Sequence, residues 1–172
     1  MNELPYYRIP EPPQHLTGTT VLLRLIDSLG FRYRWASERL RSEDADFRPA
    51  PDCMSLLELL KHILDLVRKV SVALGAEAGD APQESGIEGT RAATLEAIVS
   101  MRDRLTKMSD DELSAVVLRR SSGQTFPIWN AINGPIADAL THVGQVNGWR
   151  RAAGNPCPRA NVFTGEPPGQ EP

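Results

Sequence analysis

The segment between residues 55 and 75 constrains the fold more than any other part of the chain. Ser55 and Glu58 have the spacing of a capping box, which marks the start of a helix, and Gly75 supplies a C-terminal stop. Between them, apolar side chains cover more than half of the helix surface: Leu56, Leu57, Leu59, Leu60, Ile63, Leu64, Leu66, Val67 and Val70. A helix this apolar is packed on several sides, so we predict that it is the central element of an all-α fold.

Helical periodicity predicts three further long helices, at residues 17–41, 90–108 and 127–153. Gly30 lies inside the first of them, where a glycine marks either close packing or a kink. Pro135 lies inside the last, where it removes a backbone hydrogen bond and is expected to bend the helix. Four helices joined by loops of several residues predict a four-helix bundle.

The bundle is predicted to form a single domain over residues 17–155, flanked by two proline-rich arms. Residues 1–16 are expected to form an extended N-terminal arm, and residues 156–172 a C-terminal tail, because proline disfavours helix. Between the third and fourth helices, residues 116–118 and 124–126 are predicted to be short extended pieces. They are too short to predict a sheet.

Composition argues against several classes of function. The formal net charge of -3 argues against nucleic-acid binding, which usually requires a basic domain or stripe. The basic pairs Arg119 and Arg120, and Arg150 and Arg151, are interpreted as solvated turns or helix ends. No segment resembles a signal peptide or has the length of a membrane span, and the two cysteines do not form a disulfide framework. We therefore expect a soluble, cytoplasmic protein with no membrane partner.

The last predicted helix carries a polar row of Asp138, His142 and Gln145, because residues three, four and seven apart share one helix face. A carboxylate and an imidazole one turn apart can both bind one metal ion, at about 2.0–2.2 Å. A third ligand must come from elsewhere, and His62 is the only other histidine in a strongly apolar helical segment. We predict that His62, Asp138 and His142 form a two-histidine, one-carboxylate metal site. Gln145 is expected to hydrogen-bond across the bundle and fix the register of its helices.

These residues stand within a recognisable series of motifs. His62 lies in Leu-Leu-Lys-His-Ile-Leu and His142 opens His-Val-Gly-Gln-Val, followed by Arg-x-x-Gly-Asn-Pro at 151–156 and Asn-Val-Phe-x-Gly at 161–165. The chain in this respect resembles the DinB-like (DNA-damage-inducible, YfiT-like) superfamily. The resemblance covers nearly the whole chain by helix order, and its specific motifs lie in the second helix, the last helix and the tail. Members are four-helix bundles, often homodimers, and many bind a divalent metal through one histidine in the second helix and a His-x-x-x-His pair in the last.

The resemblance implies that His62 and His142 match two of these ligands, with Asp138 in place of the remaining histidine. Aspartate can coordinate, and it shifts metal preference toward Mn, Fe or Mg relative to a site of imidazoles that favours Zn or Ni. The implied activities are a metal-dependent hydrolase, or a transferase or isomerase that uses a low-molecular-weight thiol such as mycothiol or bacillithiol. Glu58, one turn before His62, is then a candidate general base, and a solvated helix cap is its alternative role.

A metal-free alternative stays open at this point. In it, the histidines and the aspartate form a buried hydrogen-bonded cluster in a non-enzymatic, dimeric bundle. Such a cluster needs no metal, because an imidazolium beside a carboxylate is charge-compensated.

Overall fold

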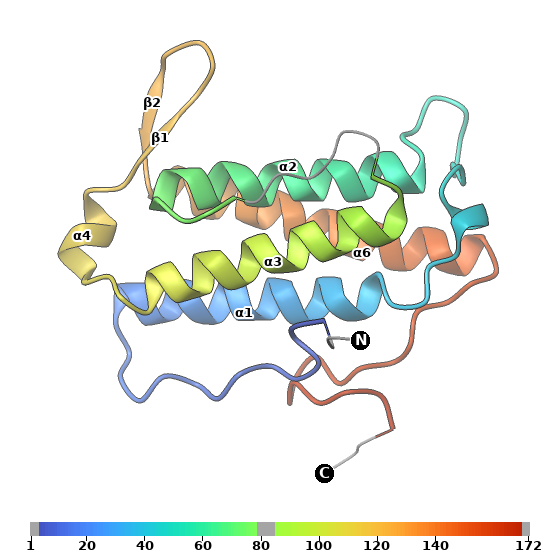
Figure 1. Ribbon diagram of the computed structural model, residues 1–172, viewed down its shortest axis with the longest axis horizontal. Helices are drawn as coiled ribbons and strands as arrows, with labels where there is room; N and C mark the ends of the chain where they lie inside the picture. The colour runs from blue at the N-terminus through green and yellow to red at the C-terminus, as the bar shows by residue number, and fades with distance from the viewer. Residues whose placement is uncertain (1–3, 79–84, 170–172) are drawn as a thin grey trace.

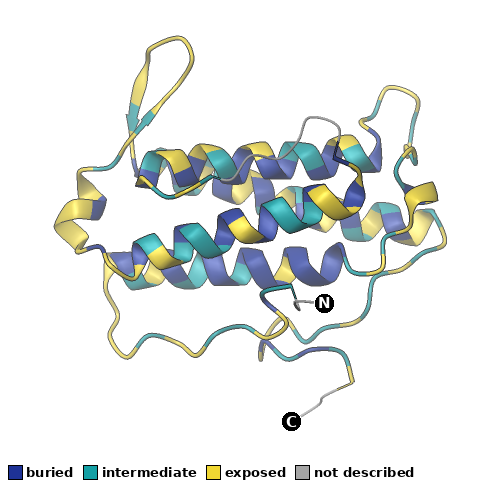
Figure 2. Cartoon of the chain, in the orientation of Figure 1, coloured by how far each residue is buried: buried dark blue, intermediate teal, exposed yellow. Residues whose placement is uncertain are grey.

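The computed structural model describes residues 4–78 and 85–169, and it shows a bundle of four long helices (Figure 1). These are α1 (Gly18–Ala36), α2 (Leu56–Leu74), α3 (Ile87–Leu105) and α6 (Ala137–Ala152). Both α1 and α2 pack against α3 and α6. The buried side chains face the inside of the bundle, and the apolar residues of α2 contribute much of the core (Figure 2). The predicted four-helix bundle is therefore confirmed.

Shorter elements connect the long helices. They are η1 (Ser42–Asp44), α4 (Asp110–Ser114), β1 (Val117–Arg119), β2 (Thr125–Pro127), α5 (Trp129–Ala131) and η2 (Ile132–Ile136). The two strands pair as an antiparallel hairpin in which Leu118 lies opposite Phe126. The extended pieces predicted here thus form a small sheet, which the sequence alone did not predict. The hairpin projects from one end of the bundle, where β1 contacts α2 (Figure 1).

The ends of α2 agree with the sequence prediction, whereas the C-terminal end of α1 does not. The amide of Glu58 donates to Ser55 Oγ at 3.2 Å, the amide of Ser55 donates to Glu58 Oε2 at 2.7 Å, and Gly75 ends α2 with a φ of 69°. The capping box and the stop are therefore as predicted. By contrast, α1 ends at Ala36 and does not reach residue 41. Arg39 takes a left-handed φ of 57°, which a continuing helix does not allow.

The last predicted helix is broken near Pro135, which is a stronger effect than the predicted bend. Gly134 has a φ of -99° and a ψ of -109°, outside helical values, and Pro135 follows it. Proline cannot donate the backbone hydrogen bond that would continue the helix. A new helix, α6, consequently begins at Ala137, and Asp138 lies in its first turn.

The N-terminal arm packs onto the bundle through Tyr6. This ring lies directly over Gly30, so close packing is the reason for the glycine in the middle of α1. The phenol donates to Asp27 Oδ1 at 3.2 Å, and Arg102 Nε donates to the same oxygen at 3.1 Å. Burial raises the pKa of both Tyr6 and Asp27 above their ordinary values. The amide of Ile9 donates to the carbonyl of residue 165, so the arm also contacts the C-terminal tail.

Arg150 is buried, contrary to the prediction that it lies at a solvated helix end. Its guanidinium donates to the carbonyls of Ala36 and Glu38, each at 2.8 Å, and to that of Asn155 at 2.9 Å. It thereby joins the end of α6 to the end of α1. Among the helices in the described part of the chain, none combines the length and the apolar character needed to cross a membrane.

Candidate metal centre

The packing of α2 against α6 brings His62, Asp138 and His142 together. One ligand atom from each of these side chains lies within 4.8 Å of the other two. Asp138 is the link between the histidines: its Oδ1 is 3.3 Å from His142 Nε2, and its Oδ2 is 3.8 Å from His62 Nε2. The two imidazole rings meet edge to face, with centroids 4.8 Å apart and an interplanar angle of 77°. All three residues named from the sequence therefore lie at one point of the fold.

These separations fit a shared metal ion. Ligand atoms bonded at about 2.1 Å in tetrahedral geometry lie about 3.4 Å apart, and those in octahedral geometry about 3.0 Å apart. The two aspartate–histidine distances are within a few tenths of an ångström of that range. The donor set of two imidazoles and one carboxylate is one that Zn, Fe, Ni and Mn all accept. The three ligand atoms lie within 4.8 Å of one another, so the side chains would have to draw closer together to share one ion.

Exposure across the centre is graded. The His142 side chain is 16% exposed, that of His62 is 31% exposed, and that of Asp138 is 47% exposed. The bundle therefore covers one side of the centre, and solvent reaches the other side next to Asp138. An ion held by these three side chains would have coordination positions open on the solvent side, as catalytic metal sites require.

Gln145 orients His142, in a way that the sequence reasoning missed. Its Oε1 lies 2.7 Å from His142 Nδ1. An amide oxygen only accepts hydrogen bonds, so this contact favours the tautomer in which Nδ1 donates to Gln145 and Nε2, which faces Asp138, has the lone pair for a metal ion. The expected bond across the bundle is thus replaced by a bond within α6. The three-residue spacing of His142 and Gln145 was the available signal for it.

Glu58 has the contacts of a helix cap. Its carboxylate accepts from the amide of Ser55, and Arg48 lies 2.9 Å away. The hydrogen bond from Ser55, with the nearby guanidinium, lowers the pKa of Glu58 below its ordinary value. A carboxylate held in its charged form is a weak proton acceptor. A role for Glu58 as a general base stays a prediction.

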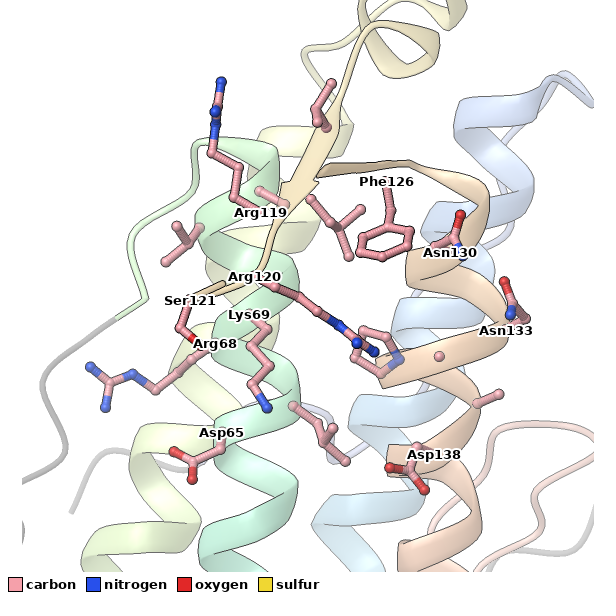
Figure 3. Close-up of a pocket in the computed structure, with 18 of the residues that line it drawn as sticks. Asp65, Arg68, Lys69, Arg119, Arg120, Ser121, Phe126, Asn130, Asn133 and Asp138 are labelled. Carbon is pink, nitrogen blue, oxygen red and sulfur yellow. The ribbon is translucent and has the colours of Figure 1, made fainter. Parts of the chain in front are cut away.

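A groove of about 1580 Å³ opens beside the centre, and Asp138 forms part of its wall (Figure 3). The other walls come from α2, from the β1–β2 hairpin and from the segment that carries Pro135. Its polar lining includes Lys69 from α2 and Arg120 from the hairpin. Sequence reasoning did not place either residue near the site, because the position of the hairpin depends on contacts between distant segments.

Solved structures share this arrangement of helices. The DinB-like protein YjoA from Bacillus subtilis matches with a TM-score of 0.61 and 15% identity, over 78% of this chain and 92% of that chain. A DinB-like protein from Bacillus cereus matches with a TM-score of 0.60 and 16% identity, over 80% of this chain and 96% of the other. This chain has the DinB-like fold.

The DinB-like fold is also that of YfiT from Bacillus subtilis, described as a probable metal-dependent hydrolase with an unusual four-helix bundle topology. It matches with a TM-score of 0.62 and 10% identity, over 84% of this chain and 94% of that chain. No protein-family profile and no curated protein sequence matches this chain. At these identities the comparisons establish the fold, and the chemistry has to be argued from the residues present.

Proposed function

We propose that this protein binds one divalent metal ion through His62, Asp138 and His142 and that it is a metal-dependent hydrolase. The observation that carries this proposal is the convergence of three ligand atoms, from two helices, within 4.8 Å. The description of YfiT, which has the same fold, as a probable metal-dependent hydrolase supports the same class of reaction.

Each residue has a distinct role in this proposal. His142, held by Gln145, presents Nε2 to the ion in a set orientation, while Asp138 contributes a negative charge at the solvent side. His62 contributes the ligand from α2, so that metal binding joins α2 to α6. When bound, the metal supplies Lewis acidity, which activates water and polarises a carbonyl group.

The same open coordination position can also hold a thiolate, and transfer of a low-molecular-weight thiol is the second reaction class that we propose. The two classes are separated by assaying the metal-loaded protein on ester, amide and electrophilic substrates, with and without bacillithiol or mycothiol. Turnover without thiol supports the hydrolase, and turnover only with thiol supports the transferase. A homodimer is a further prediction from the family resemblance, and size-exclusion chromatography with light scattering measures it directly.

Metal content tests the proposal. The wild type, His62→Ala and His142→Ala are purified without added metal, dialysed against one equivalent of Zn, Mn or Fe, and measured by elemental analysis. His15→Ala is the matched control, because this exposed histidine lies in the N-terminal arm, before α1. We expect about one ion per chain in the wild type and in the control, and a loss of most of the metal in the two site variants.

Equal metal content in the wild type and His142→Ala would remove His142 from the set of ligands. In that case the metal-free cluster would be the better description, with Asp138 forming ion pairs to one or both histidines. Circular dichroism of each variant shows whether metal loss reflects unfolding of the bundle.

A further inference from the structure

The groove beside Asp138 carries an excess of positive charge. Two of its lining residues are acidic and four are basic: Asp65 and Asp138, and Arg68, Lys69, Arg119 and Arg120. Asp138 belongs to the proposed metal site, where a divalent cation would more than balance its charge. The groove therefore presents a net positive potential to any small molecule that approaches the metal, and such a potential attracts anions.

Two of the four cations point into the groove. Figure 3 shows the guanidinium of Arg120 reaching from the hairpin across the space between α2 and the segment before α6, and the amine of Lys69 pointing along α2 toward the end of the groove where Asp65 and Asp138 lie. The side chains of Arg68 and Arg119 extend away from that space (Figure 3). Arg119 is the last residue of β1 and Arg120 follows it, and the two side chains point in different directions, Arg120 into the groove and Arg119 away from it (Figure 3).

Arg120 is held in place without an acidic partner. Its guanidinium carbon lies 5.2 Å from the centroid of the Phe126 ring, which belongs to the opposite strand. Within residues 4–78 and 85–169, neither Arg120 nor Lys69 forms an ion pair with a carboxylate. A guanidinium supported by an aromatic ring keeps its N–H groups available for bidentate hydrogen bonds to an anion such as a carboxylate or a phosphate.

The spacing between these cations and the metal site suits a small molecule. Lys69 lies seven residues after His62, which is two helical turns or about 10 Å along the axis of α2. Helical side chains lean toward the N-terminus, so the amine of Lys69 covers part of that distance. A ligand with a few atoms between its two ends can reach from the metal to the cations.

We propose that the substrate of this site carries an anionic group, a carboxylate or a phosphate, that Arg120 and Lys69 bind while its other end reaches the metal beside Asp138. This inference rests on the proposed metal site. It names the substrate class for either reaction, hydrolysis or thiol transfer, because the anionic group is bound away from the reacting end. Phe126 supplies an apolar surface near Arg120.

The test compares three ligands of equal chain length on the cobalt-loaded protein: pentanoate, glutarate and 4-phosphonobutyrate. All three have one carboxylate for the metal, and the last two add a second anionic group, so calorimetric affinities measure what that group contributes. We expect glutarate or 4-phosphonobutyrate to bind the wild type at least about tenfold more tightly than pentanoate. The better of the two identifies the anion that the groove prefers.

Three variants locate the effect. Arg120→Gln and Lys69→Gln should each reduce the preference for the dianion to about threefold or less, with unchanged cobalt content. Arg119→Gln is the matched control, because it removes the same charge from the neighbouring residue, whose side chain points away from the groove, and it should keep the preference. If Arg119→Gln reduces the preference for the dianion as much as Arg120→Gln does, the preference reflects general attraction by net charge, and the proposal is overturned.

The outcomes distinguish this inference from the proposed function. A wild type that binds cobalt through the three ligands but binds all three probes equally overturns the substrate class alone. A wild type that does not bind cobalt overturns the proposed function and this inference with it.

Discussion

Replacing Gly30 with alanine tests how the N-terminal arm is held. An alanine Cβ at this position would lie 2.6 to 2.7 Å from three ring atoms of Tyr6. A Cβ does not approach non-bonded carbon atoms this closely in real structures, so either the ring or the helix must move. The ring is the part that can move, because Tyr6 belongs to an irregular segment, whereas Gly30 is in the middle of α1. We therefore expect the substitution to displace Tyr6 from the bundle.

The size of the effect follows from what Tyr6 loses. The residue is 6% exposed, and burial of a tyrosine removes at least about 150 Å² from water, worth about 4 kcal/mol at about 25 cal/mol per Å². The hydrogen bond to Asp27 adds about 1 kcal/mol. The helix propensity of alanine returns about 1 kcal/mol, and the released arm regains about 1–2 kcal/mol of conformational entropy. We expect Gly30→Ala to lower the free energy of unfolding by about 2–3 kcal/mol.

A double-mutant cycle in urea isolates the contact. In a Tyr6→Ala background the ring is absent, so Gly30→Ala should stabilise the protein by about 1 kcal/mol through helix propensity alone. The same substitution is thus expected to change sign with the residue at position 6. If Gly30→Ala stabilises the wild type, or destabilises both backgrounds equally, the close contact with Tyr6 is not the reason for this glycine.

Three further predictions concern the site and the pH dependence of stability. Gln145→Ala should weaken metal binding about 10- to 100-fold in a chelator competition, because it frees the ring of His142; an unchanged affinity would contradict that role. Asp138→His should raise the affinity for Zn or Ni relative to Mn if this position faces the ion, and should only lower the melting temperature if it does not. The hydrogen bond from Arg41 lowers the pKa of Asp44 from 3.8 to about 2, so Asp44→Asn should cost about 2 kcal/mol at pH 7. Because the depressed pKa stabilises the fold only where Asp44 is charged, the two proteins should converge in urea titrations as the pH falls from about 4 to about 2; a constant difference would refute this origin.

The fold could be predicted from sequence because its strongest signals are local. The apolar periodicity of α2, its capping box and its terminal Gly75 all act within a few residues of the backbone that they control. The early end of α1 was missed because it depends on the left-handed backbone at Arg39, for which the sequence carries no distinctive residue. Burial of Arg150 was missed for a related reason, since its acceptors are carbonyls from the end of another helix.

The candidate site was predictable to the extent that helix geometry determines it. The four-residue spacing of Asp138 and His142 places both on one face of α6, and His62 was identified as the only other histidine in a strongly apolar helical segment. The groove was not predictable in this way. Exposed charges such as Lys69 and Arg120 have no periodic signature, and only the position of the hairpin shows that they border the same space.

The break at Gly134 and Pro135 lies between the candidate metal centre and part of the wall of the groove. Because the last helix restarts at Ala137, Asp138 lies in the first turn of α6, where it can reach both histidines. Asn130 and Asn133, which precede the break, line the groove together with the hairpin. The three candidate metal ligands thus come from helices whose packing forms the core, whereas most groove-lining residues from the break and the hairpin are exposed or only partly buried. If the proposed site is correct, substitutions on the groove side would therefore change which anion is bound without loss of the metal.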